Sequence, residues 1–265
     1  MTEIKHHAFL FDATRCIDCR ACMVACSVEN NIAMDKTRIW VAGIGIKGEF
    51  PELETASMVY HCMHCEHPDC MSACPVDAYS KREDGPVIYN PDVCIGCRYC
   101  MNACPFGVPH FDYDKGIIDG AFIDKCTMCP QRIDVGLEPA CVATCPTDAL
   151  ESGDRDELLA IAHARIAAHP ERYIDHVYGE FEKGGTSYLI LSHVPFAELG
   201  LPELRTEPIN EITESIMEGT MPFAMGWYGV LAATAAVVHT VNKRKDEKAD
   251  GQNQAEVESE TESEA

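Results

Sequence analysis

Sixteen cysteines, all between Cys16 and Cys145, constrain the fold of this 265-residue chain more than any other feature. They fall into four groups of four, and none is left over. The groups are Cys16, Cys19, Cys22 and Cys26; Cys62, Cys65, Cys70 and Cys74; Cys94, Cys97, Cys100 and Cys104; and Cys126, Cys129, Cys141 and Cys145. The count alone is compatible with a disulfide scaffold or with bound metal, so the spacing has to decide between them.

The spacing within the groups is that of a bacterial ferredoxin. The first and third groups read C-x2-C-x2-C-x3-C, the 4Fe–4S pattern. The second group widens the middle gap to four residues, and the fourth group widens it to eleven. Cysteines three residues apart on a curled loop can point at neighbouring irons of a cubane, while the backbone N–H groups of that loop point toward the anionic sulfurs. The sequence therefore predicts four 4Fe–4S clusters.

Two other chemistries also use clustered cysteines. Paired C-x2-C motifs are common in zinc ribbons, but zinc needs no C-x2-C-x2-C run with a fourth cysteine three residues later. Disulfides are disfavoured because cysteines crowded into one short run are poorly placed for S–S geometry. Neither alternative accounts for four variants of a single pattern.

The fourth cysteine of each group raises the question of which groups share clusters. In two-cluster ferredoxins this cysteine ligates the neighbouring cluster, so four groups make two cross-linked pairs. The spacing alone does not show which groups pair. Pro75, Pro105 and Pro146 follow the fourth cysteine in three groups, and Ser27 follows it in the first. Since proline suits the start of a helix, the pattern predicts a helix that begins at the fourth cysteine.

Composition divides the chain into four segments. We assign residues 1–150 to a four-cluster double ferredoxin domain of the α+β class, with two fused bacterial-ferredoxin-like modules of short β-hairpins and short helices around the clusters. Strands are predicted at 7–11 and 38–46. Residues 151–220 contain a helix predicted from Asp154 to His169, a strand from Tyr188 to Leu191, and a polar connector. The acidic tail, 243–265, is predicted to be disordered.

An uncharged stretch from Pro222 to Val241 is long enough to cross about 30 Å of hydrocarbon as a helix. We therefore predict a transmembrane anchor over 221–242, with a buried helix of the soluble domain as the alternative. Acidic residues precede the stretch, and Lys243, Arg244 and Lys245 follow it. The positive-inside rule then places the tail in the cytoplasm and the cluster domain on the outer, periplasmic face of the cell membrane. The rival topology, with a cytoplasmic cluster domain, runs against that rule.

Charge and motifs exclude several function classes. The formal net charge of −22 argues against a nucleic-acid partner, because phosphates would be repelled. The sequence has no glycine-rich dinucleotide or phosphate-binding motif. It also shows no acid–base or nucleophile constellation beside the cysteines, so we predict no catalytic residues and a role in electron transfer.

With the four groups in place, residues 1–195 resemble the four-cluster ferredoxin-like iron–sulfur subunits of membrane-bound molybdoenzymes and related hydrogenases. Within that family the chain is most similar to the beta subunit of respiratory formate dehydrogenase. The similarity lies in Lys-Cys-Thr-Met-Cys at 125–129, Gly-Leu-Glu-Pro-Ala-Cys at 136–141 and Thr-Cys-Pro-Thr at 144–147. A Gly-Gly-Thr stretch at 184–186 is a further shared feature.

The resemblance implies that the first group pairs with the fourth and the second with the third. Carried onto this sequence, the ligand sets are Cys16, Cys19, Cys22 and Cys145; Cys126, Cys129, Cys141 and Cys26; Cys62, Cys65, Cys70 and Cys104; and Cys94, Cys97, Cys100 and Cys74. Some relatives have tryptophan in place of a cysteine of the third group and hold a 3Fe–4S cluster. Because Cys97 is present here, four cubanes are expected.

The resemblance also implies partners. Electrons would come from a molybdenum- or tungsten-pterin catalytic subunit like that of formate dehydrogenase, and pass to a membrane cytochrome b or other quinone-reducing subunit. The alternatives are a hydrogenase, with its large subunit as partner, another quinone-linked oxidoreductase, and a free polyferredoxin carrier. The predicted anchor in the lipid bilayer favours a complex, since a diffusing carrier needs none.

The cysteine groups generate the first testable prediction. Chain purified under anaerobic conditions is expected to contain about sixteen irons and about sixteen acid-labile sulfides, because each cubane holds four of each. Metal and sulfide analysis measures both quantities. Zinc at a comparable level with little iron would show that the cysteines serve a different metal.

Overall fold

The computed structural model describes residues 5–33, 36–112, 123–208, 210, 220, 223 and 225–243. The chain forms two compact units, Met1–Asn210 and Glu211–Ala265, and the cysteines all belong to the first. The predicted disordered tail, apart from Lys243, and most of the second half of the predicted polar connector lie outside the described residues.

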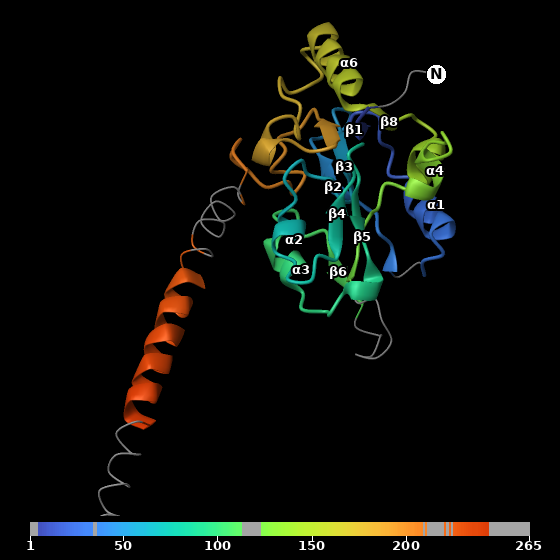
Figure 1. Cartoon of the computed structure of the whole chain (residues 1–265). Coiled ribbons are helices and arrows are strands. Elements are labelled where there is room, and N and C mark those ends of the chain that lie inside the picture. The colour runs from blue at the N-terminus through green and yellow to red at the C-terminus, as the bar shows by residue number, and fades with distance from the viewer. Residues whose placement is uncertain are drawn as a thin grey trace, which may run out of the picture. The chain divides into compact units, whose positions relative to one another are not determined.

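The first unit is built on a three-stranded sheet with an N-terminal strand at its centre (Figure 1). Strand β1 (His7–Asp12) pairs antiparallel with β8 (Leu150–Asp154) and parallel with β9 (Tyr188–Leu191). The sheet therefore ties together three segments that are far apart in the sequence. The predicted strands at 7–11 and 188–191 are both confirmed.

The two faces of this sheet have different roles because strand side chains alternate between them. Phe9 and Phe11 are buried in the core cluster that also contains cysteines of the first, second and fourth groups. Ala8 and Leu10 are buried instead against helix α6 (Arg155–Ala168). One face of the sheet thus forms a wall of the cysteine region, and the other is covered by a helix.

Helix α6 agrees closely with the helix predicted from Asp154 to His169. The carboxylate of Asp154 accepts a hydrogen bond from the backbone N–H of Asp156, which caps the helix start. Leu158, Ala162 and Ile166 repeat at intervals of four residues and are buried against the sheet.

Three short antiparallel hairpins complete the β structure. Strand β2 (Trp40–Lys47) pairs with β3 (Glu54–Tyr60), β4 (Tyr79–Lys81) with β5 (Val87–Tyr89), and β6 (His110–Phe111) with β7 (Ile123–Asp124). Figure 1 shows helices α1 and α4 on one side of these strands and α2 and α3 on the other. Two 3-10 turns, η2 (Pro91–Val93) and η3 (Glu182–Gly184), lie in the connections.

Four short helices carry the third cysteine of each group. They are α1 (Ala21–Glu29), α2 (Asp69–Ser72), α3 (Tyr99–Ala103) and α5 (Ala140–Ala143), while α4 (Pro130–Ile133) follows Cys129. The prediction that a helix begins at the fourth cysteine is wrong. Cys26 lies inside α1, and Cys74, Cys104 and Cys145 lie just after α2, α3 and α5, because the single turn between the third and fourth cysteines is itself the helix.

The predicted α+β class, with hairpins and short helices around the cysteines, agrees with the structure, but the predicted transmembrane helix at 221–242 is wrong. Residues 225–243 are helical, yet no helix in the described part of the chain is long and apolar enough to span a bilayer. The physical reason is that polar and small residues lower the mean hydropathy of this helix. Gly226, Gly229, Thr234 and His239 interrupt a segment whose other members include several small alanines.

A glycine next to the central sheet yields a stability prediction. Gly179 has φ +99°, and a Cβ there would lie 2.3 Å from the carbonyl oxygen of Tyr188. Gly179→Ala is expected to cost about 3 kcal/mol or more, since the positive φ alone costs about 1–3 kcal/mol and the clash adds to it. Gly45→Ala is the matched control, because Gly45 has φ +84° but nothing within 4 Å of a Cβ. Anaerobic thermal unfolding compares them, and equal losses of stability would contradict the packing argument.

Candidate iron–sulfur centres

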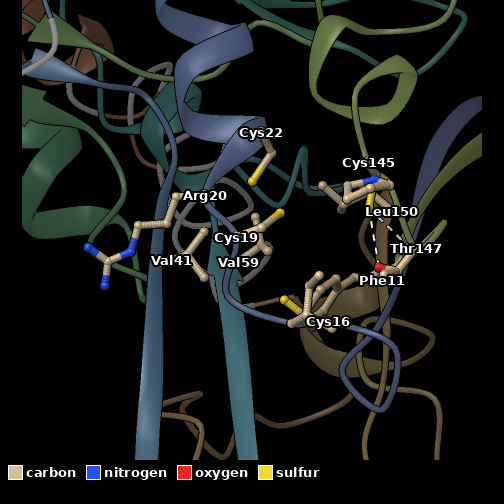
Figure 2. Close-up of a pocket in the computed structure, with 13 residues that line it drawn as sticks. Phe11, Cys16, Cys19, Arg20, Cys22, Val41, Val59, Cys145, Thr147 and Leu150 are labelled. Atoms are coloured by element: carbon tan, nitrogen blue, oxygen red, sulfur yellow. Dashed lines mark hydrogen bonds between the residues drawn. The ribbon is translucent and has the colours of Figure 1, made fainter.

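The first candidate centre, called centre 1, consists of Cys16, Cys19, Cys22 and Cys145. These four cysteines line one pocket together with apolar side chains from four strands, Phe11, Val41, Val59 and Leu150. Figure 2 shows their sulfur atoms facing a common space, while the guanidinium of Arg20 extends away from it. Burial and then the neighbouring Cys16 thiolate together raise the pKa of Cys22 to about 12.

Centre 2 consists of Cys26, Cys126, Cys129 and Cys141, and it is the most deeply placed. All four residues are buried. Burial raises the pKa of Cys141 well above its usual value, and the thiolates of Cys126, Cys129 and Cys26 raise it further. The four sulfurs are therefore close enough to act on one another electrostatically.

Centre 3 consists of Cys62, Cys65, Cys70 and Cys104, which line a second pocket. Most of the remaining lining is apolar and includes Pro68, Val87, Phe106 and Val108. The charged side chains in the lining are Asp69, Lys125 and Lys183. The pKa of Cys65 is raised to about 12, because burial outweighs the lowering effect of the Lys183 ammonium.

Centre 4 consists of Cys74, Cys94, Cys97 and Cys100. Cys100 is buried in an apolar cluster against which Cys74 and Cys94 pack. Burial raises the pKa of Cys100, and the thiolates of Cys94 and Cys97 raise it further. Two tyrosines belong to the same cluster, with ring centroids 5.2 Å apart: Tyr79 beside Cys100 and Tyr89 beside Cys94.

The loop after the first cysteine has the same conformation in all four groups. The second residue along has positive φ in each case: Asp18, His64, Gly96 and Met128. In three groups this residue also donates its backbone N–H to the first cysteine sulfur, over 3.5 Å from His64, 3.4 Å from Gly96 and 3.4 Å from Met128. Ala78 and Ala149 donate in the same way to the sulfurs of Cys74 and Cys145, each over 3.2 Å. These backbone dipoles stabilise negative charge on sulfur.

The chemistry of the donor set fits a cluster rather than a single ion. Thiols buried in apolar surroundings resist ionisation, and a group of four is stable as thiolates only when bound cations compensate the charge. Among the described residues, no three His, Cys, Asp or Glu side chains converge closely enough to hold one metal ion. Four cysteines spread around a pocket suit the larger cubane, in which each sulfur binds a different iron.

The centres follow one another in a single order. Burial raises the pKa of the Cys126 thiol in centre 2, and the thiolate of Cys62 in centre 3 raises it too, so centres 2 and 3 are neighbours. Tyr188 belongs to one core cluster with Cys22 of centre 1 and Cys141 of centre 2, and burial and then these two thiolates raise its pKa. Tyr79 links centres 3 and 4 in the same way, through Cys70 and Cys100. The arrangement is a row from centre 1 to centre 4.

Several side chains near the centres cannot be predicted from the cysteine spacing. Asp69, Tyr79 and Tyr89 lie within or beside the second and third groups, but their types alone do not mark them. Lys183 is distant in sequence from every cysteine, and only its position next to the Gly-Gly-Thr stretch draws notice. His64, in contrast, uses Nδ1 to accept the backbone N–H of Val87 over 2.9 Å and so holds the loop in place.

The fold and these centres define a double ferredoxin. Two family models agree, both described as a 4Fe-4S dicluster domain, one matching residues 12–78 and the other residues 54–155. Two such domains and sixteen cysteines correspond to four 4Fe–4S clusters.

Full-length relatives extend the similarity beyond the cysteine region. The hydrogenase-2 operon protein HybA of Escherichia coli O157:H7 is 34% identical over 88% of this chain and 84% of its own length. The nitrate-inducible formate dehydrogenase iron–sulfur subunit of E. coli K12 is 34% identical over 87% of this chain and 83% of its own length. A putative dimethyl sulfoxide reductase iron–sulfur subunit of Halobacterium salinarum is 37% identical over 58% of this chain and 68% of its own length.

The chain therefore belongs to the family of ferredoxin-like 4Fe–4S iron–sulfur subunits of hydrogenase, formate dehydrogenase and related redox complexes. It is an electron-transfer subunit, as the sequence predicts.

The position of Cys26 yields a prediction about ligation. Burial and then the Cys129 thiolate raise the pKa of Cys26, and the Cys26 thiolate in turn raises the pKa of Cys126 and of Cys141. Cys26→Ser is therefore expected to disturb the cluster of centre 2 and leave that of centre 1, which Cys145 completes. EPR spectroscopy and iron analysis of the purified variant test this, with Cys145→Ser as the reciprocal control. Loss of the centre 1 signal in Cys26→Ser with centre 2 intact would show that the fourth cysteine of the first group does not ligate the neighbouring cluster.

Proposed function

We propose that the four cysteine sets each ligate one 4Fe–4S cluster and that the chain carries electrons from a catalytic subunit, at one end of the row, to an acceptor at the other. A bound 4Fe–4S cluster supplies one-electron redox chemistry. The protein contributes the row itself, the apolar walls that exclude water, and the N–H groups directed at the sulfurs.

The observation that carries this proposal is the exposure of the two end centres. Cys19 in centre 1 and Cys97 in centre 4 are the exposed cysteines of the described chain, and centre 2 is buried entirely. Each exposed cysteine lies two residues after a large exposed apolar residue, which is Ile17 at 63% exposure for Cys19 and Ile95 at 61% for Cys97. Exposed apolar side chains beside a redox centre suit contact with another protein. One end can therefore receive an electron while the other delivers it.

The catalytic partner is proposed to be of the formate dehydrogenase class, with a molybdenum- or tungsten-pterin. Relatives named as formate dehydrogenase iron–sulfur subunits, at 34% and 36% identity, support this assignment. A hydrogenase large subunit is the second candidate, and the 34% identity to HybA favours it equally. The identities do not separate the two, so the substrate has to be decided by experiment.

The acceptor is proposed to be a membrane subunit that reduces quinone, such as a cytochrome b. We propose that this partner brings the chain to the membrane. The predicted outer-face location of the cluster domain stays a prediction. It is based on the positive-inside rule, which applies only to the flanks of a membrane-spanning helix, and the predicted helix at 221–242 is wrong.

Native purification tests the function. A tagged chain isolated anaerobically in mild detergent is expected to retain a larger catalytic subunit and to have its iron reduced by that subunit's substrate. Reduction by formate, with bound molybdenum or tungsten, supports the first candidate, and reduction by H2 supports the second. A fully iron-loaded chain that is isolated alone, without a partner at any detergent concentration, would indicate a free polyferredoxin and overturn the proposal.

A further inference from the structure

Both fully buried lysines of the described chain line the pocket of centre 3. Lys125 is 1% exposed and Lys183 is not exposed at all. Each lies in the pocket lining with Cys62, Cys65, Cys70 and Cys104. Burying an ammonium group is costly unless a negative group compensates it. Two such groups at one pocket indicate that the pocket holds an anion when the protein is complete.

The two lysines differ in how their charge is compensated by protein. The Nζ of Lys183 lies 2.5 Å from a carboxylate oxygen of Asp69, so this cation is paired. The Nζ of Lys125 donates to the carbonyl oxygens of Val87 over 2.5 Å and Cys126 over 3.0 Å. Among the described residues no carboxylate lies within ion-pair distance of Lys125. Its positive charge is therefore left to act on the contents of the pocket.

Among the described residues, the cations beside the other three centres differ from Lys125 in exposure or in pairing. Arg20, beside centre 1, is exposed, forms an ion pair with Asp18 and extends away from the pocket (Figure 2). Arg38, beside centre 2, donates from Nε to both carboxylate oxygens of Asp124, over 2.8 and 2.9 Å. Arg98, next to Cys97 in centre 4, is exposed to solvent, where screening weakens its field.

Neutral side-chain hydrogen bonds to cysteine sulfurs compete with this effect at the other centres. Asn30 donates from Nδ2 to the sulfur of Cys26 over 3.7 Å in centre 2, and the Thr147 hydroxyl lies 3.9 Å from the sulfur of Cys145 in centre 1. At centre 4 the buried hydroxyls of Tyr79 and Tyr89 lie beside the sulfurs of Cys100 and Cys94. A hydroxyl or amide dipole stabilises an added electron less than a full cation does at the low dielectric of a buried site. Lys125 should therefore outweigh these neutral groups.

We propose that Lys125, assisted weakly by the Lys183–Asp69 pair, makes centre 3 the most easily reduced of the four centres, so that an electron entering the row rests there. This inference rests on the proposed ligation of a 4Fe–4S cluster by Cys62, Cys65, Cys70 and Cys104. Reduction adds one electron and no atoms, and the nearby ammonium favours the more negative state. Net charge around a cluster is one of the quantities that set its potential.

The test is an anaerobic redox titration of the full, iron-loaded chain followed by EPR. In Lys125→Met, the ratio of reduced to oxidised centre 3 at a given applied potential is expected to fall at least tenfold, which is about 59 mV for a one-electron couple. Lys125→Arg keeps the charge and should restore most of the ratio. Cys70→Ser identifies the centre 3 signal, because Cys70 lines the centre 3 pocket and does not line the centre 1 pocket.

Three comparisons make the result specific. Lys47→Met, which removes a cation from an exposed ion pair with Glu198, should shift no centre. The double variant Lys183→Met/Asp69→Asn removes a neutral pair and should shift centre 3 less than Lys125→Met does. Lys125→Gln keeps a donor for Val87 and should show the same loss if methionine is not accommodated.

Three outcomes overturn the inference. It is wrong if the centre 3 potential is unchanged in Lys125→Met and Lys125→Gln at full iron content, or if all four centres shift equally. It is also wrong if another centre is reduced before centre 3 in the unmodified chain. Failure of the proposed function has a different signature, because the unmodified chain would then lack iron or the four reducible signals.

Discussion

The structure depends on four groups of cysteine thiolates in largely apolar surroundings and on the positive charge that stabilises them there. Without bound iron, each group would place mutually repelling anions in apolar surroundings, as the raised pKa values of Cys22, Cys26 and Cys65 show. Backbone N–H groups directed at the sulfurs relieve part of that cost. The short helices, the left-handed loop residues and the small hairpins all follow from surrounding these anions with backbone dipoles.

Single helical turns connect the centres to one another. In every group the third and fourth cysteines are four residues apart, so one turn separates them and they rise by about 6 Å along the helix axis. The third cysteine belongs to one centre and the fourth to its neighbour, as Cys70 and Cys74 do for centres 3 and 4. The helices pack in matching pairs, α1 against α5 and α2 against α3. The spacing that ligates iron therefore also fixes the distance between adjacent centres.

The sequence predicts the parts of this structure whose signal is local. The cysteine groups, the strands at 7–11 and 188–191 and the helix after Asp154 are readable because spacing, alternation and capping are properties of short segments. The position of Lys183 in the centre 3 pocket is not readable, because it depends on a contact between distant parts of the chain. The predicted membrane span at 221–242 is wrong for a different reason. Absence of charge is a weaker condition than sufficient hydropathy, and glycine, threonine and neutral histidine satisfy only the first.

The fourth cysteine of each group belongs to the centre of its partner group, and this exchange constrains the order in which the centres can be completed. During synthesis, all four cysteines of centre 3 and of centre 4 are available once Cys104 has been made, but centres 1 and 2 wait for Cys145 and Cys141. Strand β1, the first element of the chain, receives its second neighbour only when β9 is complete at Leu191. The four cysteines of the first group therefore lack a complete ligand set while most of the domain is translated, and they spend longer as free thiols than any other cysteines of the chain.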